Sequence, residues 1–186
     1  SGISGGNRIS LVKILGGIIT KAKGGNATDT NSGDGGHGIY SDGALTISQS
    51  ENSKSTTIGT AQGGTSTNGT GGSGIYSCDT LTISQRDNST STTIGTAQGG
   101  TSTNGTGGNG IYSSRELKID GGAAITNATG GNGKSGGSGL FGKTMEILTS
   151  TIQKAIGGRS TGEESYHTGG AGIAGSESLT IEGNTT

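Results

Sequence analysis

Short apolar phrases recur along the chain at nearly constant spacing, separated by longer polar stretches. One phrase, Gly-Gly-x-Gly followed by an apolar residue, occupies 35–39, 71–75, 107–111, 136–140 and 169–173. Successive copies begin 36, 36, 29 and 33 residues apart, and a degenerate copy lies near residue 2. Such periodicity predicts a single array over 1–186, with units starting near residues 2, 38, 74, 110, 139 and 172.

Two further phrases follow in each unit. The second reads apolar, polar, apolar and occupies 9–11, 45–47, 81–83, 117–119, 145–147 and 179–181. The third, Ile-x-x-Ala-x-Gly-Gly, begins at Ile19, Ile58, Ile94, Ile125 and Ile152. Alternation of apolar and polar residues is typical of a half-buried strand. Each complete unit is therefore predicted to contribute three short strands.

Three short strands per unit, repeated at near-constant length, predict an all-β fold, a right-handed parallel β-helix (β-solenoid) of about five to six coils. Equivalent residues would then stack in columns at the strand spacing of about 4.8 Å. Ile39 is expected beside Ile75 and Ile111, and Leu45 beside Leu81. The right-handed sense is the one that parallel crossovers almost always take.

Composition raises disorder as an alternative, because only 25% of residues are hydrophobic, 3% are aromatic and 43 are glycine. A disordered chain has no physical reason to hold Ile, Leu and Ala at a fixed phase while the intervening loops change. The fixed phase favours a packed interior. The chain has no proline, which fits strands paired on both edges.

Charge narrows the range of partners. The formal net charge is −1 and the 12 basic residues are scattered, so a nucleic acid partner is not expected. The apolar cluster over 9–19 is interrupted by Lys13 and two glycines and is too short to cross a bilayer, so no membrane span is predicted.

An aromatic column is the most distinctive candidate site. It consists of Tyr40, Tyr76, Tyr112 and Phe141, each directly after the apolar residue of the first phrase. Calcium-binding nonapeptide repeats have aspartate at this position, so no metal site is predicted here. The rings are expected to point outward. They could bind a sugar face or a neighbouring filament, or they could stack on one another and stiffen the sheet.

No catalytic, cofactor-binding or metal-binding residues are predicted. His37 occupies a variable turn position, and Cys78 has Asp42 and Ser114 as its expected column neighbours. His167 is close in sequence to an acidic pair, 163–164, but the spacing fits no metal-ligand pattern. Acids rarely recur at the unit spacing: Asp42 is followed by Cys78 and Ser114, and Glu51 by Asp87 and then Ala123. No catalytic pair of acids is predicted from this register, which disfavours a polysaccharide-cleaving enzyme.

Threonine columns could suggest an ice-binding surface. The column of Thr46, Thr82 and Thr180 is interrupted by Lys118 and Glu146, which disfavours that function.

The alternation of Gly-Gly-x-Gly-Ile and Leu-Thr-Ile phrases resembles the Gly/Ser/Thr-rich parallel β-helix repeats of secreted bacterial surface proteins and adhesins. The resemblance implies an extracellular or cell-surface location and an adhesive or scaffolding role. Neither end carries a recognisable cap, which suggests a fragment of a longer protein or a subunit that stacks. We expect a non-enzymatic structural protein that pairs with itself, head to tail, in a filament or adhesin stalk. The alternative is a carbohydrate-binding module of a larger surface protein, with a glycan as its partner.

Overall fold

The fold was analysed in a computed structural model, which describes all residues except 1, 6–10, 29–32, 51–53, 87–89 and 184–186. The described residues form strands and no helices. The strands are β1 (Ile3–Gly5), β2 (Leu11–Leu15), β3 (Gly17–Lys23), β4 (Ile39–Ser41), β5 (Ala44–Ser48), β6 (Thr56–Gln62), β7 (Ile75–Ser77), β8 (Leu81–Ser84), β9 (Thr92–Gln98), β10 (Ile111–Asp120), β11 (Ala124–Thr129), β12 (Leu140–Leu148), β13 (Thr151–Ile152), β14 (Ala155–Ile156) and β15 (Ile173–Glu182).

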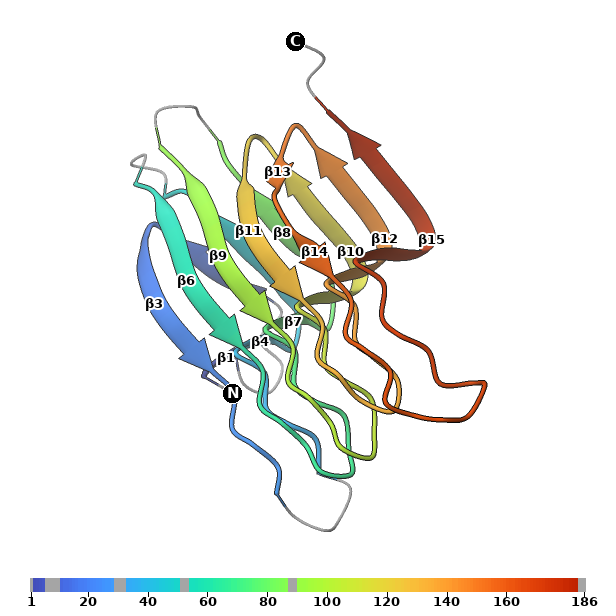
Figure 1. Cartoon of the computed structure of the whole chain (residues 1–186). Helices are drawn as coiled ribbons and strands as arrows, with labels where there is room; N and C mark the ends of the chain where they lie inside the picture. Colours follow the sequence, from blue (N-terminus) through green and yellow to red (C-terminus); the bar gives the residue numbers. More distant parts are fainter. Residues whose placement is uncertain (1, 6–10, 29–32, 51–53, 87–89, 184–186) are drawn as a thin grey trace.

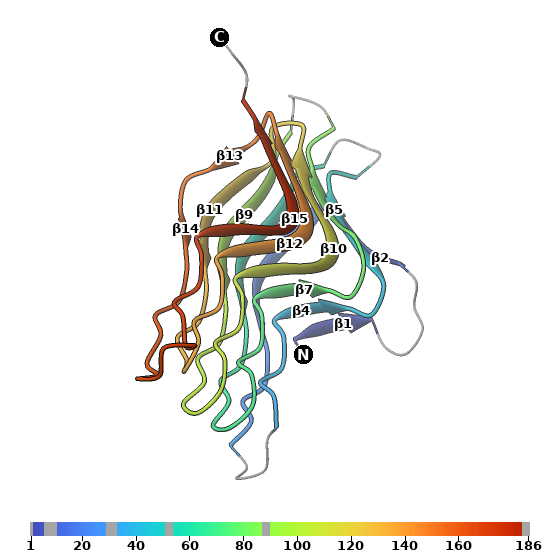
Figure 2. The same cartoon turned by 90° about the vertical axis from the view of Figure 1, so that its right-hand side faces the viewer.

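The strands form two parallel sheets (Figure 1). In the first, nine-stranded sheet, β10 pairs with β7 and β8 on one side and with β12 on the other, and β15 follows β12. The second, six-stranded sheet has the order β13-β11-β9-β6-β3, with β14 also paired to β11. The chain passes through the first sheet and then the second in each repeat, so successive repeats lie side by side (Figure 2).

The predicted fold class, a right-handed parallel β-helix with three short strands per coil, is wrong. It requires three sheets, one for each phrase, whereas the structure has two layered parallel sheets. The first and second phrases share one sheet, because β10 runs through both phrases as a single strand and pairs with β7 and then with β8. A register shift within β10, between Ser113 and Glu116, marks the bend that is visible in Figure 2.

A column of buried serines lies at this bend. Ser41, Ser77 and Ser113 are adjacent on neighbouring strands and have no exposed surface. Each hydroxyl donates to the backbone carbonyl three residues ahead, at distances of 3.0, 3.1 and 2.7 Å. A buried hydroxyl is tolerated when it is hydrogen-bonded. These bonds therefore allow the chain to turn here without leaving a buried serine hydroxyl unpaired.

The predicted column register is confirmed for the later repeats but is wrong for the first copy of the second phrase, because 12–14 and not 9–11 align with 45–47. Ile39 pairs with Ile75, which pairs with Ile111, and Leu45 pairs with Leu81. In the second sheet Ile94 lies between its equivalents of the flanking strands, Ile58 and Ile125. Equal phrase lengths thus place like residues side by side.

The core lies between the two sheets and is made of these columns. Its largest fully buried side chains are Ile39, Leu45, Ile47, Ile58, Ile75, Leu81, Ile83, Ile94, Ile111, Leu117, Ile119 and Ile125. Both sheets contribute to one continuous cluster. Burial at an equivalent position decreases toward the last strand: Ile119 of β10 is 0% exposed, whereas Ile181 of β15 is 60% exposed.

Among the described residues, the structure contains no helix that could serve as a membrane-spanning segment.

Candidate functional site

The aromatic column lies on the outer face of the first sheet. Each ring follows a buried aliphatic residue on its strand, so alternation turns it away from the core. Neighbouring rings are stacked. Their centroids are 5.6 Å apart for Tyr40 and Tyr76, 4.7 Å for Tyr76 and Tyr112, and 5.2 Å for Tyr112 and Phe141. On β15 the next position is Ala174, which ends the aromatic column.

His37 extends the stacking, which the sequence did not suggest. Its ring is 5.4 Å from that of Tyr40 and 4.2 Å from that of Tyr76, measured between centroids. Its Nδ1 accepts a hydrogen bond of 2.9 Å from the backbone N–H of Ser73, so in the neutral ring the proton is on Nε2. Burial lowers the pKa of His37 to about 4, which keeps the imidazole neutral at physiological pH.

Cys78 and two tyrosines form a hydrogen-bonded group beside the stack. The Tyr40 hydroxyl is 3.6 Å from Cys78 Sγ and donates to Asp42 Oδ1 at 3.1 Å. The Cys78 hydrogen bond raises the pKa of Tyr40, and burial raises the pKa of Tyr76 to about 12. Ser114 donates from its hydroxyl to the Cys78 carbonyl, so Cys78 has the expected column neighbours. Both phenols stay protonated at physiological pH.

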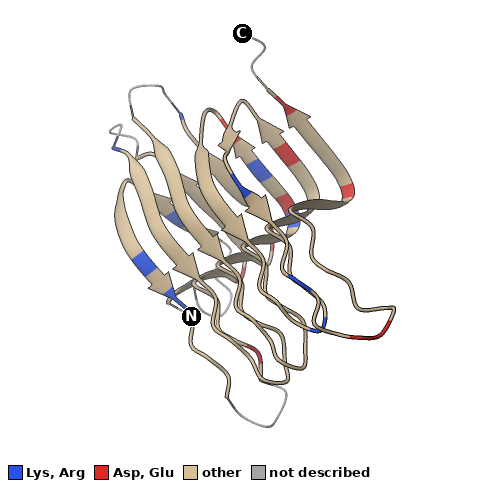
Figure 3. Ribbon diagram, in the orientation of Figure 1, with Lys and Arg blue, Asp and Glu red and all other residues tan. Residues whose placement is uncertain are grey.

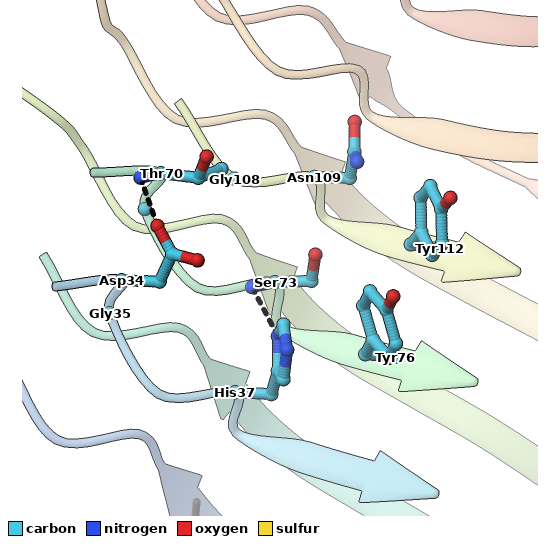
Figure 4. A pocket seen from close by; sticks show the side chains of 10 residues that line it. Asp34, Gly35, His37, Thr70, Ser73, Tyr76, Gly108, Asn109 and Tyr112 are labelled. Atoms are coloured by element: carbon cyan, nitrogen blue, oxygen red, sulfur yellow. Dashed lines mark hydrogen bonds between the residues drawn. The ribbon is translucent and has the colours of Figure 1, made fainter. Parts of the chain in front are cut away.

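A pocket of about 290 Å³ opens beside His37 (Figure 4). The residues around it come from three successive repeats and are Asp34, Gly35, His37, Thr70, Gly71, Ser73, Tyr76, Gly108, Asn109 and Tyr112. Asp34 Oδ1 accepts from the Thr70 N–H, which leaves its second carboxylate oxygen as an acceptor. Asn109 Oδ1 accepts from the backbone of Ser138, which leaves the amide NH₂ as a donor. The pocket can therefore hold a small polar molecule with both donors and acceptors.

A second, more polar pocket of about 370 Å³ lies at the variable loop of the fifth unit. It includes Lys134, Glu163, Glu164 and His167. His167 Nδ1 is 3.4 Å from the Ser135 hydroxyl. Within the described ranges, no group of three His, Cys, Asp or Glu side chains could hold a metal ion.

Charged side chains are spread over both sheets and the loops, as Figure 3 shows. Several of them pair across or along strands. Lys118 Nζ is 3.5 Å from Glu146 on the next strand and 3.7 Å from Asp120 on its own strand. Lys143 and Glu177 pair at 2.8 Å. Lys118 and Glu146 thus occupy directly adjacent positions on neighbouring strands.

No family model, no curated protein and no solved structure matches this chain. The resemblance to adhesin repeats therefore stays a prediction, and the candidate site is described by its own geometry.

The sequence predicts the aromatic column but not the pocket beside it. Asp34, His37 and Asn109 lie in or next to the Gly-Gly-x-Gly phrases and match no binding motif. A signal was present, because His37, Ser73 and Asn109 are each 36 residues apart and a 36-residue spacing places side chains next to one another. Because these three residues differ chemically, the sequence alone does not reveal that they share a site.

Lowering the pH is expected to destabilise the fold through His37. Its pKa of about 4 in the folded protein lies below the ordinary value of 6.5, so the unfolded chain binds the proton first. The free energy of unfolding should therefore fall as the pH drops from 6.5 to 4, and His37 should account for about 1 to 2 kcal/mol of that loss after solvent screening of its partly exposed ring. Urea unfolding at several pH values measures the change.

The matched control is His37→Asn, because Asn109 already makes the same hydrogen bond from the equivalent position. This variant keeps an acceptor for the Ser73 N–H and removes the titrating group. Its stability should vary less with pH over this range than that of the wild type. Parallel pH profiles for the two proteins would contradict the assignment.

Proposed function

We propose that this protein is a non-enzymatic structural protein whose copies pair head to tail through their edge strands and form a filament or stalk. The observation that carries the proposal is the exposure of core positions at the last strand. Leu179 and Ile181 of β15 are 44% and 60% exposed, whereas their equivalents on β10 are fully buried. Among the described strands, none pairs with the outer edge of β15, which therefore offers backbone N–H and C=O groups to a further strand.

The opposite edge of the stack carries the start of the same columns. Ile3 of β1 begins the column that ends at Ile173, and Val12 of β2 begins the column that ends at Leu179. A second copy placed one strand spacing beyond β15 would continue every column with its own first strands. Ile14 would then lie beside Ile181 and cover it. Such an open, heterologous contact grows a filament.

A glycine column gives the sharpest test of this contact. In four repeats the last glycine of the third phrase lies very close to the equivalent glycine of the preceding repeat. A Cβ added to any of these four would overlap the carbonyl oxygen of that equivalent glycine; they are Gly64, Gly100, Gly131 and Gly158. Gly25, at the same place in the first complete copy of the phrase, has nothing within 4 Å of such a Cβ. In the proposed contact Gly25 of one copy would face the carbonyl of Gly158 in the next.

Gly25→Ala should therefore leave the isolated chain as stable as the wild type and abolish assembly. Negative-stain microscopy and sedimentation velocity measure assembly, and thermal unfolding of dilute protein measures stability. Asn104→Ala, a loop change away from both edges, is the control and should assemble normally. A wild-type protein that stays monomeric at every concentration would overturn the proposal; further repeats in a longer chain would have the same result. Normal filaments of Gly25→Ala would also overturn it.

An extracellular or cell-surface location is part of the proposal. It is supported by the resemblance of the repeat phrases to those of secreted bacterial surface proteins and adhesins. A scaffold role also fits a fold in which the longest buried columns contain aliphatic side chains, one methionine (Met145) and serine.

Glycan binding is the second candidate, favoured by the pocket beside Tyr76 and Tyr112. The aromatic column itself argues against sugar stacking, because sugars pack on ring faces and the inner faces already cover one another. Donors from His37 and Asn109 and the Asp34 carboxylate would have to carry recognition. Glycan-array binding by monomeric protein, lost in Tyr76→Ala, would favour this function over the structural one.

A further inference from the structure

One outward-facing column of the second sheet ends in lysine on both sides. Lys21 of β3 pairs with Thr60, which pairs with Thr96, which pairs with Asn127. The next strand follows at a constant offset of 27 residues, shown by the pairs Ile125 with Ile152 and Ala128 with Ala155. Lys154 therefore lies beside Asn127. The interior of the column is neutral, and both of its ends are positively charged and exposed.

We infer that head-to-tail assembly brings Lys21 of one copy directly beside Lys154 of the next, so that ionic strength controls the assembly. This inference rests on the proposed function, because neither copy alone contains the pair. Directly adjacent strands are about 4.8 Å apart, and like charges facing each other at that spacing are destabilising. The junction differs in this way from the interior of the stack, where Lys118 faces Glu146.

The other charges at the junction do not offset this repulsion. Lys13 would lie opposite Thr180, with Glu182 as a diagonal neighbour at about 7 to 8 Å. Lys23 would lie opposite Ile156, with Lys154 as a diagonal neighbour that adds to the repulsion. Glu177 already pairs with Lys143 of its own copy at 2.8 Å. The directly opposed lysines are the closest charges across the contact among the described residues.

Salt should therefore promote assembly. Screening acts over about 30 Å at 0.01 M ionic strength and about 8 Å at 0.15 M, so added salt weakens the repulsion between exposed lysines. The apolar contacts of the junction do not depend on screening in this way, and salts that are excluded from protein surfaces strengthen them. The wild type is expected to have a lower critical concentration for assembly at about 0.15 M NaCl than at about 0.01 M.

The pair is tested by a charge-reversal cycle at low ionic strength. Lys21→Glu and Lys154→Glu should each lower the critical concentration by about two- to fivefold, because each places opposite charges side by side. The double variant restores like charges and should return close to the wild-type value. Arg86→Glu changes the net charge equally but lies in a loop in the middle of the stack, and should leave the critical concentration unchanged.

The outcomes separate this inference from the proposal beneath it. Critical concentrations that change steadily with net charge, so that each single variant lies between the wild type and the double variant, would overturn the lysine pairing while leaving head-to-tail assembly in place. Wild-type assembly that weakens with salt would do the same. If neither the wild type nor either single variant assembles at any salt concentration, the proposed assembly itself fails.

Discussion

Replacing Ile94 by alanine is expected to lower the free energy of unfolding by about 2 to 5 kcal/mol. Ile94 is fully buried and lies between Ile58 and Ile125 in the second sheet. Truncation removes buried methyl groups and leaves a cavity whose walls belong to two neighbouring repeats. The flanking strands are held in register by backbone hydrogen bonds, so they cannot move inward to fill it. Urea unfolding of the isolated chain measures the loss.

Asn104→Ala is the control for this substitution. Asn104 is exposed, and its side-chain amide donates to Asn68 at 2.8 Å on the surface. Its replacement should change the free energy of unfolding by less than about 0.5 kcal/mol. Equal losses in the two variants would show that the aliphatic columns do not form the stabilising core.

The column register could be predicted from the sequence because the phrases have constant length. Successive third phrases begin at Ile58, Ile94 and Ile125, which predicts that Ile94 lies between the other two, and the structure confirms this. The outward direction of Tyr76 followed in the same way from alternation with Ile75. Periodicity thus defines which residues share a column where the phrases are well preserved. It failed in the first repeat, where 12–14 and not 9–11 align with 45–47.

The number of sheets could not be predicted in this way. The three phrases predict three strands per repeat, and a parallel β-helix with three strands per coil places each phrase in its own sheet. The structure keeps both phrases in one sheet, and the buried hydroxyl of Ser113 bonds across the bend to the Glu116 carbonyl. A serine in such a gap is as typical of a turn as of a bent strand, so the pattern alone does not distinguish them.

The pocket beside His37 could not be predicted from the sequence for a different reason. His37 was interpreted as a turn residue because the equivalent positions hold serine, asparagine and alanine. Its role depends on contacts with rings in its own and the next repeat, Tyr40 and Tyr76, and not on any local pattern. The sequence also suggested that the aromatic column could bind a sugar, but in the structure neighbouring rings cover one another's faces.

Gly100→Ala is expected to destabilise the fold by at least about 3 kcal/mol, the upper end of ordinary overpacking. A Cβ at Gly100 would overlap the carbonyl oxygen of Gly64 on the preceding repeat. That carbonyl accepts a hydrogen bond of 2.8 Å from the N–H of Gly72, so it cannot move aside without breaking the bond. No flexible side chain is available to relieve the overlap, and the strain must pass into the backbone of two repeats.

The chain supplies the matched control for this prediction in Gly25, which has the same place in the repeat but no preceding strand among the described residues. Gly25→Ala should change the free energy of unfolding of dilute, unassembled protein by less than about 1 kcal/mol. Thermal and urea unfolding of both variants measure the difference. If Gly100→Ala were as stable as Gly25→Ala, the close approach of successive repeats at this column would be incorrect. The prediction that Gly25→Ala blocks filament assembly depends on the same close approach between copies, so it would then be incorrect as well.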